Sequence, residues 1–326
     1  MKAAVLHGNR DLRYEEYPTP PVLPNTVKVR VRAAGICGSD VSRVLHHGAH
    51  FYPIVLGHEF SGFVADSLDT GLVGKRACVF PILPCGKCEF CKDERWASCV
   101  KYDYYGSRRD GGMQSELRIK EENLVFLPDS VSYAAGAMIE PAAVCLHAVK
   151  KAEITPSTRV LVYGAGTIGL LAAMWAKCLG AAEVYVSDIN ERRTELAKDL
   201  GFKLYGGEKV DAVIEASGAA AALNDAIENC EPFGRIVLVG HGKSDVTLGH
   251  EKFVKILRKQ LTLVGSWNSD FTSEVNDWKE SVEAIAEGKI FPERLITHEI
   301  PLAESPRAFE MIKEGKEFYN KILLVN

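Results

Sequence analysis

Two patterns of hydrophobic and polar positions divide this sequence near Pro141. Before that residue, short apolar or alternating runs such as 27–33, 60–65, 77–81 and 116–119 are separated by Gly, Pro, Asn and Asp. Such runs are typical of an irregular, largely antiparallel β domain. After it, short apolar runs alternate with segments of helical periodicity, which favours a parallel sheet with helices on both faces. We therefore predict an α/β chain with two kinds of domain.

The alternating part predicts a doubly wound parallel sheet. Its expected strands are 159–163, 183–187, 202–205, 212–215, 235–239 and 261–264, and its expected helices are 168–179, 191–200, 219–229 and 251–259. After a further helix at 274–287, the chain returns to segments punctuated by Pro and Gly and ends in a strand at 321–325. We place this tail on the first domain. The predicted domains are residues 1–145 with 288–326, a discontinuous domain, and residues 146–287, the sheet domain.

Composition and charge narrow the classes of function. The 326 residues are 47% hydrophobic and 25% charged, which excludes disorder and collagen-like repeats. The net charge of -4 gives no global basic field, so we expect neither nucleic acid nor a membrane as partner. No apolar stretch near the N-terminus is as long as a signal-peptide core, and the longest apolar segment, 159–180, carries Arg159 and Lys177. We expect a cytoplasmic protein.

Four of the nine cysteines crowd into one short segment, as Cys85, Cys88, Cys91 and Cys99. In a reducing compartment, clustered thiols at this spacing favour metal ligation over disulfides. Four thiolates close a tetrahedral site without an open position, which is typical of structural zinc. A four-iron cluster with short spacing would have a last gap of three followed by Pro, whereas here the gap is seven and Val100 follows. Zinc is therefore preferred.

A dinucleotide fingerprint follows the first strand of the sheet domain. Gly164, Gly166 and Gly169 have G-x-G-x-x-G spacing between a strand and a helix, and Asp188 ends the next strand. The glycines permit a tight turn, close approach of a pyrophosphate and packing of helix on sheet. Asp188 is expected to accept hydrogen bonds from ribose hydroxyls and to repel a 2′-phosphate, which favours NAD over NADP. The sheet domain is thus predicted to be a Rossmann domain.

The Rossmann pattern is interrupted after the third strand. Between the expected strand 202–205 and the strand that begins near Asp211, only about five residues remain, whereas a parallel crossover needs about a dozen. A crossover helix is therefore missing. Either the third strand is rudimentary, or residues 206–210 pass under the sheet as extended chain. Because this alters the adenine end of the pocket, we expect somewhat weaker NAD binding.

Other potential metal ligands are single residues in suggestive settings: Cys37 in GICGSD, His58 and Glu59 in LGHEFSG, and Glu140 in MIEP. Each alone is more often an ordinary buried or satisfied side chain. A combined set of Cys, His and carboxylate with one open position is what catalytic zinc requires. The spacing alone does not show that these residues converge.

The chain resembles the zinc-dependent medium-chain dehydrogenase/reductase superfamily, and within it the polyol dehydrogenase branch. The resemblance rests on motifs that occur in the expected order over essentially the whole chain: GICGSD, GHEFSG, the four-cysteine lobe, the Glu140 context and GAGTIG. The resemblance implies a GroES-like catalytic domain beside the Rossmann domain. It implies a catalytic zinc held by Cys37, His58 and Glu140, with Glu59 next to the metal and Asp40 orienting His58. It also implies two zinc ions per chain and a homodimer or homotetramer formed through the nucleotide domain.

The same resemblance assigns further roles. The cofactor-binding set comprises Gly164, Gly166, Thr167, Ile168, Gly169, Asp188 and Arg193. Ser39 resembles the hydroxyl that starts a proton relay in zinc alcohol dehydrogenases. His46, His47 and His50 are either later members of that relay or surface histidines.

The substrate class depends on GSRRDGG, where Arg108 and Arg109 can present forked donors to a phosphate or form a solvated charged turn. Arg43 and the basic run Lys255, Arg258 and Lys259 are weaker candidates. A phosphorylated polyol is the leading expectation, with galactitol 1-phosphate oxidised to tagatose 6-phosphate. An unphosphorylated polyol such as sorbitol or L-iditol is the alternative. A third, remote alternative is a non-catalytic dinucleotide-binding protein. Such a protein would be expected to lack one of the zinc ligands.

Overall fold

The structure, a computed structural model, describes residues 1–242 and 245–326. The chain forms two compact units. The first comprises residues 1–140, 270–287 and 295–326, and the second comprises residues 141–269 and 288–294. The first unit is thus discontinuous in sequence.

One helix expected in the sheet domain lies in the first unit instead. This helix, α9 (Asp277–Ala286), buries Trp278 against Phe80 and Phe271, with ring centroids 5.5 and 6.4 Å away. Because buried aromatic rings dominate the energetics of a core, this contact places α9 with Phe80. The expected domains were residues 1–145 with 288–326, and residues 146–287. They differ from the compact units most clearly in residues 270–294.

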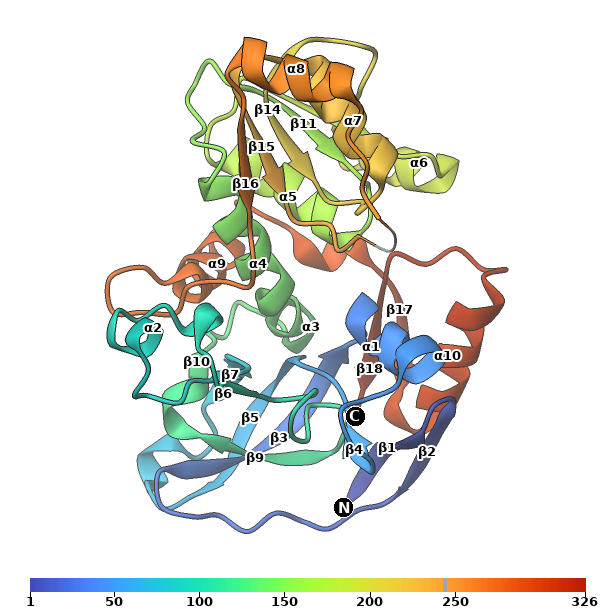
Figure 1. Ribbon diagram of the computed structural model, residues 1–326. Coiled ribbons are helices and arrows are strands. Elements are labelled where there is room, and N and C mark those ends of the chain that lie inside the picture. Colours follow the sequence, from blue (N-terminus) through green and yellow to red (C-terminus); the bar gives the residue numbers. More distant parts are fainter. Residues whose placement is uncertain (243–244) are drawn as a thin grey trace. The chain divides into compact units, whose positions relative to one another are not determined.

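The first unit is built mainly from antiparallel strands (Figure 1). A three-stranded sheet has the order β2 (Asp11–Glu16), β1 (Lys2–Gly8), β4 (Ile54–Val55). A seven-stranded sheet has the order β10 (Leu124–Phe126), β6 (Arg76–Val79), β5 (Glu59–Ser67), β3 (Thr26–Gly35), β18 (Lys321–Val325), β17 (Ile296–Pro301), with β9 (Glu116–Lys120) also on β3. Alternate residues of β3 are fully buried, namely Val27, Val29 and Val31. The irregular β domain read from the sequence is thus present.

Short helices and one hairpin complete the first unit. The helices are α1 (Gly38–Ser42), α2 (Glu89–Lys92), α3 (Tyr133–Ala137), α9 and α10 (Ser305–Glu314), and the hairpin pairs β7 (Ile82–Leu83) with β8 (Asp103–Tyr104). The C-terminal strand β18 pairs antiparallel with β3, so that Leu323 lies opposite Gly35. The expected return of the chain's tail to this unit therefore occurs through the central sheet.

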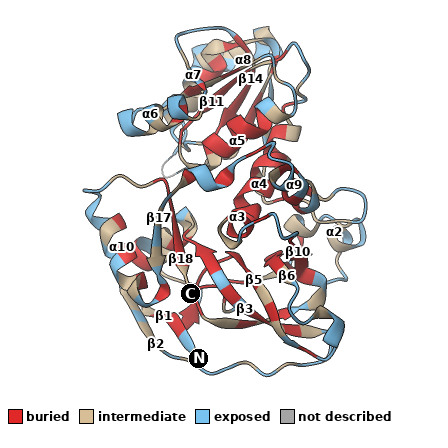
Figure 2. Cartoon of the chain, turned by 180° about the vertical axis from the view of Figure 1, so that it is seen from behind, coloured by how far each residue is buried: buried red, intermediate tan, exposed pale blue. Residues whose placement is uncertain are grey.

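The second unit is a six-stranded parallel sheet flanked by helices (Figure 1). The strand order is β13 (Lys203–Leu204), β12 (Glu183–Ser187), β11 (Arg159–Tyr163), β14 (Val210–Glu215), β15 (Cys230–Leu238), β16 (Thr262–Gly265). The helices are α4 (Ile139–Lys150, which begins in the first unit), α5 (Thr167–Cys178), α6 (Glu191–Asp199), α7 (Ala220–Asn229) and α8 (His250–Lys259). The central strands β11 and β14 are buried along almost their whole length (Figure 2). This order reverses at β11, as in a Rossmann fold, and the predicted fold class is confirmed.

The structure confirms that one crossover helix is missing from the second unit, between β13 and β14. Strand β13 has only two residues and pairs with β12 at the sheet edge, while the next strand, β14, lies on the far side of β11. Five residues, 205–209, connect them without a helix. At about 3.3 Å per residue, extended chain of this length reaches roughly 17 Å, enough to pass two strands spaced about 4.8 Å apart. The rudimentary third strand is therefore present, and the five-residue connection is long enough to reach β14 if it is extended.

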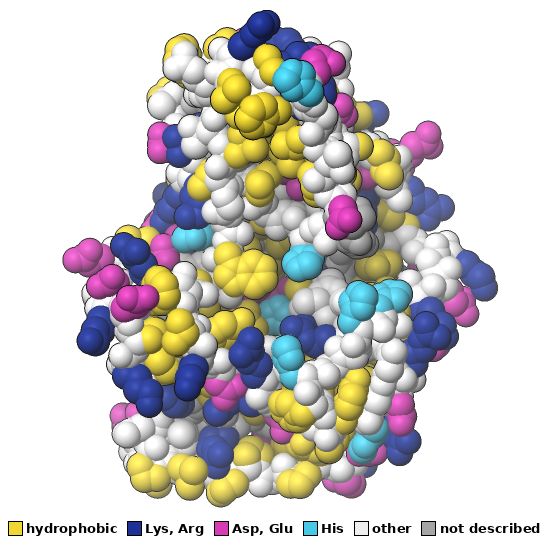
Figure 3. Space-filling model, viewed as in Figure 1, with side chains coloured by type: hydrophobic (Ala, Val, Ile, Leu, Met, Phe, Trp, Pro, Cys, Tyr) yellow, Lys and Arg dark blue, Asp and Glu magenta, His cyan; other side chains and the backbone are white. Residues whose placement is uncertain are grey.

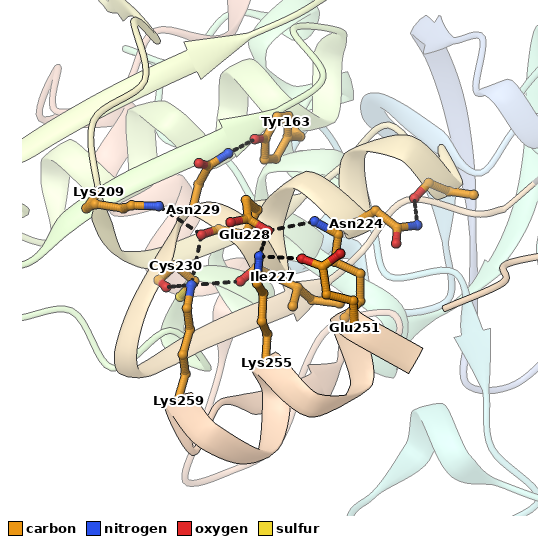
Figure 4. Close-up of polar contacts among 12 residues, drawn as sticks. Tyr163, Lys209, Asn224, Ile227, Glu228, Asn229, Cys230, Glu251, Lys255 and Lys259 are labelled. Carbon is orange, nitrogen blue, oxygen red and sulfur yellow. Dashed lines mark hydrogen bonds and ion pairs between the residues drawn. The ribbon is translucent and has the colours of Figure 1, made fainter. Parts of the chain in front are cut away.

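The C-terminal end of α7 is capped by lysines from neighbouring segments (Figure 4). Lys259 Nζ donates to the carbonyl oxygens of Ile227, Glu228 and Cys230 at 3.0, 2.8 and 2.7 Å. Lys255 forms ion pairs with the Glu228 and Glu251 carboxylates. Because the last carbonyls of a helix lack intrahelical donors and carry partial negative charge, these lysines stabilise the junction between α7 and α8. Lys255 and Lys259, two members of the basic run, therefore have structural partners within the second unit.

Candidate active site and cofactor site

Three candidate zinc ligands are brought together by the register of two antiparallel strands in the first unit. Gly35, the last residue of β3, lies opposite Glu59, the first residue of β5. Cys37 follows β3 at the start of α1, and His58 directly precedes β5. The ligand atoms of Cys37, His58 and Glu59 lie within 4.8 Å of one another. The convergence that spacing alone did not show is therefore a consequence of strand pairing.

Asp40 lies fully buried beside His58. Its Oδ2 accepts a hydrogen bond from the Cys37 backbone N–H at 3.0 Å, and its Oδ1 is 3.8 Å from His58 Nδ1 and 3.9 Å from Arg43 Nη1. Within the described chain, Asp40 Oδ1, His58 Nδ1 and Arg43 Nη1 make no hydrogen bond. A ligating imidazole needs a partner on its second nitrogen. Asp40 is thus located where it can orient His58, and burial raises the pKa of its carboxyl group although His58 opposes that rise.

Glu140 and Tyr104 form the other side of the site. Glu140 lies in the first turn of α4, outside the 4.8 Å group, and its Oε1 accepts a hydrogen bond from Tyr104 Oη at 3.5 Å. The Tyr104 ring contacts His58 edge-on, with centroids 5.6 Å apart. Burial raises the pKa of Glu140 to about 8 and, with the charge of Glu140, raises that of Tyr104 well above its usual value. Tyr104 therefore remains a protonated donor at neutral pH.

A lysine from the C-terminal strand completes the site. Lys321 begins β18, donates to the Ile36 carbonyl at 3.2 Å and forms an ion pair with Glu59 Oε2. The Lys321 and Glu59 side chains are only 4% and 3% exposed. Burial lowers the pKa of Lys321, but the charges of Glu59 and Cys37 outweigh this effect and the net shift is upward. A Cβ at residue 35 would collide with Glu59 Oε2 and lie 2.9 Å from Lys321 Cε, so Gly35 is what lets the pair form.

The donor set fits zinc. Thiolate, imidazole and carboxylate are the ligand types of catalytic zinc sites, which keep one position open for substrate. Burial raises the pKa of Cys37 to about 12, and the charges of Glu59 and Asp40 add to this rise. Because a bound metal favours the deprotonated form of its ligands, a dication at this point would stabilise Cys37 and Glu140 in their charged forms.

The four-cysteine lobe fits a second zinc. The Sγ atoms of Cys85, Cys88, Cys91 and Cys99 all lie within 4.8 Å of one another. Cys88 and Cys91 Sγ are 3.5 Å apart, and Cys85 and Cys91 Sγ are 3.9 Å apart. A tetrahedral site with Zn–S bonds of about 2.3 Å requires sulfur atoms roughly 3.8 Å apart. Hydrogen bonds from the Lys87 and Cys88 backbone N–H groups lower the pKa of Cys85 to about 6, which favours its thiolate.

In the second unit, the predicted fingerprint residues occupy the turn between β11 and α5. Gly164 has a φ of +95°, in the region that favours glycine. A Cβ on Gly169 would collide with the Gly164 carbonyl oxygen, so this position needs glycine for helix–strand packing. Gly166 is the N-cap of α5, followed by Thr167 and Ile168 in its first turn. The amide groups at this helix start are oriented for a phosphate.

Asp188 lies at the end of β12, beside the same turn. Its Oδ2 accepts a hydrogen bond from the Ala165 backbone N–H at 2.7 Å, and its Oδ1 accepts one from the Asn190 N–H at 2.8 Å. Arg193 Nη1 lies 3.7 Å from Asp188 Oδ2. The structure therefore brings the acidic residue, Arg193 and the glycine turn together at the carboxyl edge of the sheet, where doubly wound proteins bind nucleotides.

The two candidate phosphate ligands have different surroundings. Arg109 donates from Nε to Asp103 Oδ2 at 2.7 Å, and its Nη2 lies 2.6 Å from the same oxygen. Arg108 instead stacks on the Tyr102 ring at 4.3 Å, and that ring contacts Tyr104, with centroids 6.2 Å apart. Both arginines line a cavity of about 430 Å³ that none of the candidate zinc ligands lines. The guanidinium of Arg109 is thus engaged by a carboxylate, whereas Arg108 is linked through two rings to the active site.

The candidate relay residues also differ. Ser39 is half-buried in α1, and its hydroxyl lowers the pKa of the nearby Cys37 thiol, against the larger rise caused by burial. His46, His47 and His50 are all exposed. Ser39 is therefore adjacent to a candidate ligand, and the three histidines are surface residues of the first unit.

Comparison with known proteins identifies the family. Residues 23–129 match the alcohol dehydrogenase GroES-like domain, and residues 167–287 match the zinc-binding dehydrogenase domain. The chain is 35% identical over 320 residues to galactitol 1-phosphate 5-dehydrogenase of Escherichia coli K12, covering 91% of this chain and 92% of that protein. The chain belongs to the zinc-dependent medium-chain dehydrogenase/reductase superfamily. It is an oxidoreductase of the zinc alcohol and polyol dehydrogenase group, and its cofactors are zinc and NAD, as predicted.

Other relatives show the range of the group. The chain is 30% identical over 341 residues to sorbitol dehydrogenase of Bombyx mori, covering 96% of this chain and 95% of that protein. The crystal structure of galactitol-1-phosphate dehydrogenase from Escherichia coli matches with a TM-score of 0.93 and 33% identity over all of both chains. Two cofactor complexes each match with a TM-score of 0.91 and cover all of this chain and 99% of theirs. One is an alcohol dehydrogenase of Escherichia coli CFT073 with NADH, at 27% identity. The other is a putative zinc-binding dehydrogenase of Sinorhizobium meliloti with NADP, at 26% identity.

Two zinc ions per chain are typical of this family, which agrees with the two donor sets described above. No helix in residues 1–242 or 245–326 is long and apolar enough to cross a membrane.

Sequence reasoning missed Tyr104 and Lys321. Tyr104 lies in a tyrosine-rich stretch whose only visible signal was its nearness to the arginine pair. Lys321 opens the otherwise apolar strand KILLV, and a lone lysine at a strand start is usually solvated. Only the pairing of β18 with β3 shows that this lysine is buried at the site.

Proposed function

We propose that this enzyme oxidises a secondary alcohol of a phosphorylated hexitol with NAD, converting galactitol 1-phosphate to tagatose 6-phosphate. The observation that carries the reaction type is the buried convergence of Cys37, His58 and Glu59, with Glu140 beside them. Zinc held by these residues would supply a Lewis acid that lowers the pKa of a substrate hydroxyl.

The chain's own residues have distinct parts in this proposal. Cys37, His58 and Glu140 hold the metal, Asp40 orients His58, and Glu59 is kept beside the site by Lys321. The protonated Tyr104 hydroxyl donates to Glu140 and orients that carboxylate toward the metal. Ser39 next to Cys37 is the proposed first acceptor of the substrate proton. In the second unit, the glycine turn and Asp188 bind NAD, with Arg193 beside the adenosine.

Arg108 is the residue that favours a phosphorylated substrate. It is stacked on Tyr102, two ring contacts from His58, and its Nη1 donates to the Tyr102 carbonyl oxygen at 3.4 Å, whereas Asp103 engages Arg109. A specific observation favours the alternative, an unphosphorylated polyol such as sorbitol or L-iditol: Asp103 and Asp110 line the same cavity and oppose an anion there. Substrate assays separate the two.

The test compares galactitol 1-phosphate with galactitol and sorbitol under NAD and NADP. We expect the phosphorylated substrate to have the higher kcat/KM. Replacing Arg108 with Ala should raise KM for galactitol 1-phosphate about tenfold, because a charge-assisted hydrogen bond contributes about 1.5–3 kcal/mol, while leaving turnover of sorbitol unchanged. Arg109→Ala is the matched control, because Asp103 already engages the Arg109 guanidinium. Equal turnover of free and phosphorylated polyols would favour the alternative.

We also propose that the chain forms a homodimer through the second unit, or a homotetramer built from such dimers. Within the described residues, β16 pairs only with β15 and leaves one edge open. Apolar side chains gather on the face that carries α8 (Figure 3), where Phe253 and Leu257 are 54% and 59% exposed, and Trp267 beyond β16 is 62% exposed. Open edges and exposed apolar residues mark interaction surfaces. Sedimentation velocity of Trp267→Glu should show a shift toward monomer.

A further inference from the structure

A second cavity lies in the second unit, near the C-terminal ends of two of its helices. It has a volume of about 370 Å³ and is lined by residues from the end of α5, the segment after α6 and residues 289–294. Met174 and Phe202 are buried in its wall, and Phe291 is 50% exposed. Volumes of this order are typical of sites for small organic molecules.

The charged residues of this cavity all have one sign. Lys177, Lys289 and Arg294 line it, and no Asp or Glu is among the described residues that do so. Part of this charge compensates helix ends, because Lys177 lies in the last turn of α5 and Arg294 Nη2 donates to the Asp199 carbonyl of α6 at 2.9 Å. A helix C-terminus carries roughly half a negative charge, so the two helix ends together balance about one of the two cations Lys177 and Arg294. Arg294 also has further N–H groups beyond the one used.

The cavity is distinct from the nucleotide site. The glycine turn precedes the first residue of α5, whereas Lys177 and Met174 are in its last turns. Twelve helical residues separate the two ends by about 18 Å. A molecule in the cavity would therefore not overlap a dinucleotide at the helix N-terminus.

We propose that this cavity binds a small organic anion with an apolar body, such as an alkyl or aryl carboxylate. The apolar part packs on Met174, Phe202 and Phe291, and the anionic group faces Lys177 and Arg294. An anion is favoured over a neutral ligand by the charge of the lining, and a purely inorganic anion would leave the apolar wall unused.

Octanoate is the probe, added to the zinc-loaded enzyme saturated with NAD and followed by isothermal titration calorimetry. Binding is expected to persist with NAD present and to weaken about tenfold with 1-octanol in place of octanoate. Lys177→Glu should lower octanoate affinity about tenfold, and Phe291→Ser about fivefold. Arg258→Glu, an equal charge change on α8, should leave the affinity within twofold of the wild type.

Three results would overturn the proposal: no octanoate binding at millimolar concentration, equal affinity for octanol, or equal effects of Lys177→Glu and Arg258→Glu. Since Phe291 is only partly buried, Phe291→Ser should fold, and its circular dichroism spectrum checks this. If Phe291→Ser instead changes the sedimentation coefficient, a second copy of the chain covers the cavity and the proposal fails.

Discussion

Replacing Lys321 with Met should destabilise the enzyme strongly, because the substitution leaves a buried carboxylate without its cation. Lys321 and Glu59 are 4% and 3% exposed, and Lys321 Nζ contacts both Glu59 Oε2 and the Ile36 carbonyl oxygen. Removing one partner of such a buried pair costs about 3–5 kcal/mol, whereas an exposed pair contributes about 0–1 kcal/mol. Equilibrium urea unfolding of the zinc-loaded enzyme measures the difference.

Two further variants isolate the cause. Lys28→Met removes the cation of a more exposed pair with Asp66, at 3.6 Å, and should cost no more than about 1 kcal/mol. The double variant Lys321→Met with Glu59→Gln removes both charges and should recover more than half of the loss, since the two residues are directly coupled. Zinc content is measured in each variant to show that metal loss is not the cause. A Lys321→Met enzyme as stable as Lys28→Met would refute this account of the site.

Three other predictions test separate parts of the molecule. Cys88→Ala should reduce zinc from two to one per chain and lower thermal stability, as measured by atomic absorption and calorimetry, because the remaining thiols cannot close a tetrahedral site. Asp188→Ala should lower the NAD-to-NADP ratio of kcat/KM about tenfold, since a hydrogen bond to a charged group contributes about 1.5–3 kcal/mol; an unchanged ratio would contradict the role of Asp188. Hydrogen bonds from Lys252 and Lys255 lower the pKa of Glu228 from 4.5 to about 2, so its stabilising contribution is present above pH 4.5 and is lost as the pH falls toward 2. The difference in unfolding free energy between wild type and Glu228→Gln should therefore be constant above pH 5 and shrink below it.

Local spacing was sufficient to predict much of the second unit. The alternation of strands and helices, together with the glycine fingerprint, predicted a Rossmann domain, and the short connection near Gly206 indicated the missing helix. These features depend on residues close together in sequence. The same holds for Cys85 to Cys99, whose four thiols lie in one short lobe.

Features that depend on pairing between distant segments were not predictable. Lys321 reaches Glu59 only because β18 joins β3, across 262 positions of sequence. The engagement of Arg109 by Asp103 is local in sequence, but it depends on the conformation of the loop after β8, which composition does not fix. The placement of α9 followed from the aromatic partners of Trp278, and no periodicity in α9 identifies those partners.

Zinc content and NADH formation in Cys37→Ala test the central claim most directly. Wild-type enzyme should contain two zinc ions per chain and reduce NAD in the presence of galactitol 1-phosphate. The variant should retain one zinc, in the four-cysteine lobe, and produce no NADH above background. A variant that keeps two zinc ions, or that still oxidises the alcohol at the wild-type rate, would contradict a catalytic zinc centre at Cys37, His58 and Glu140.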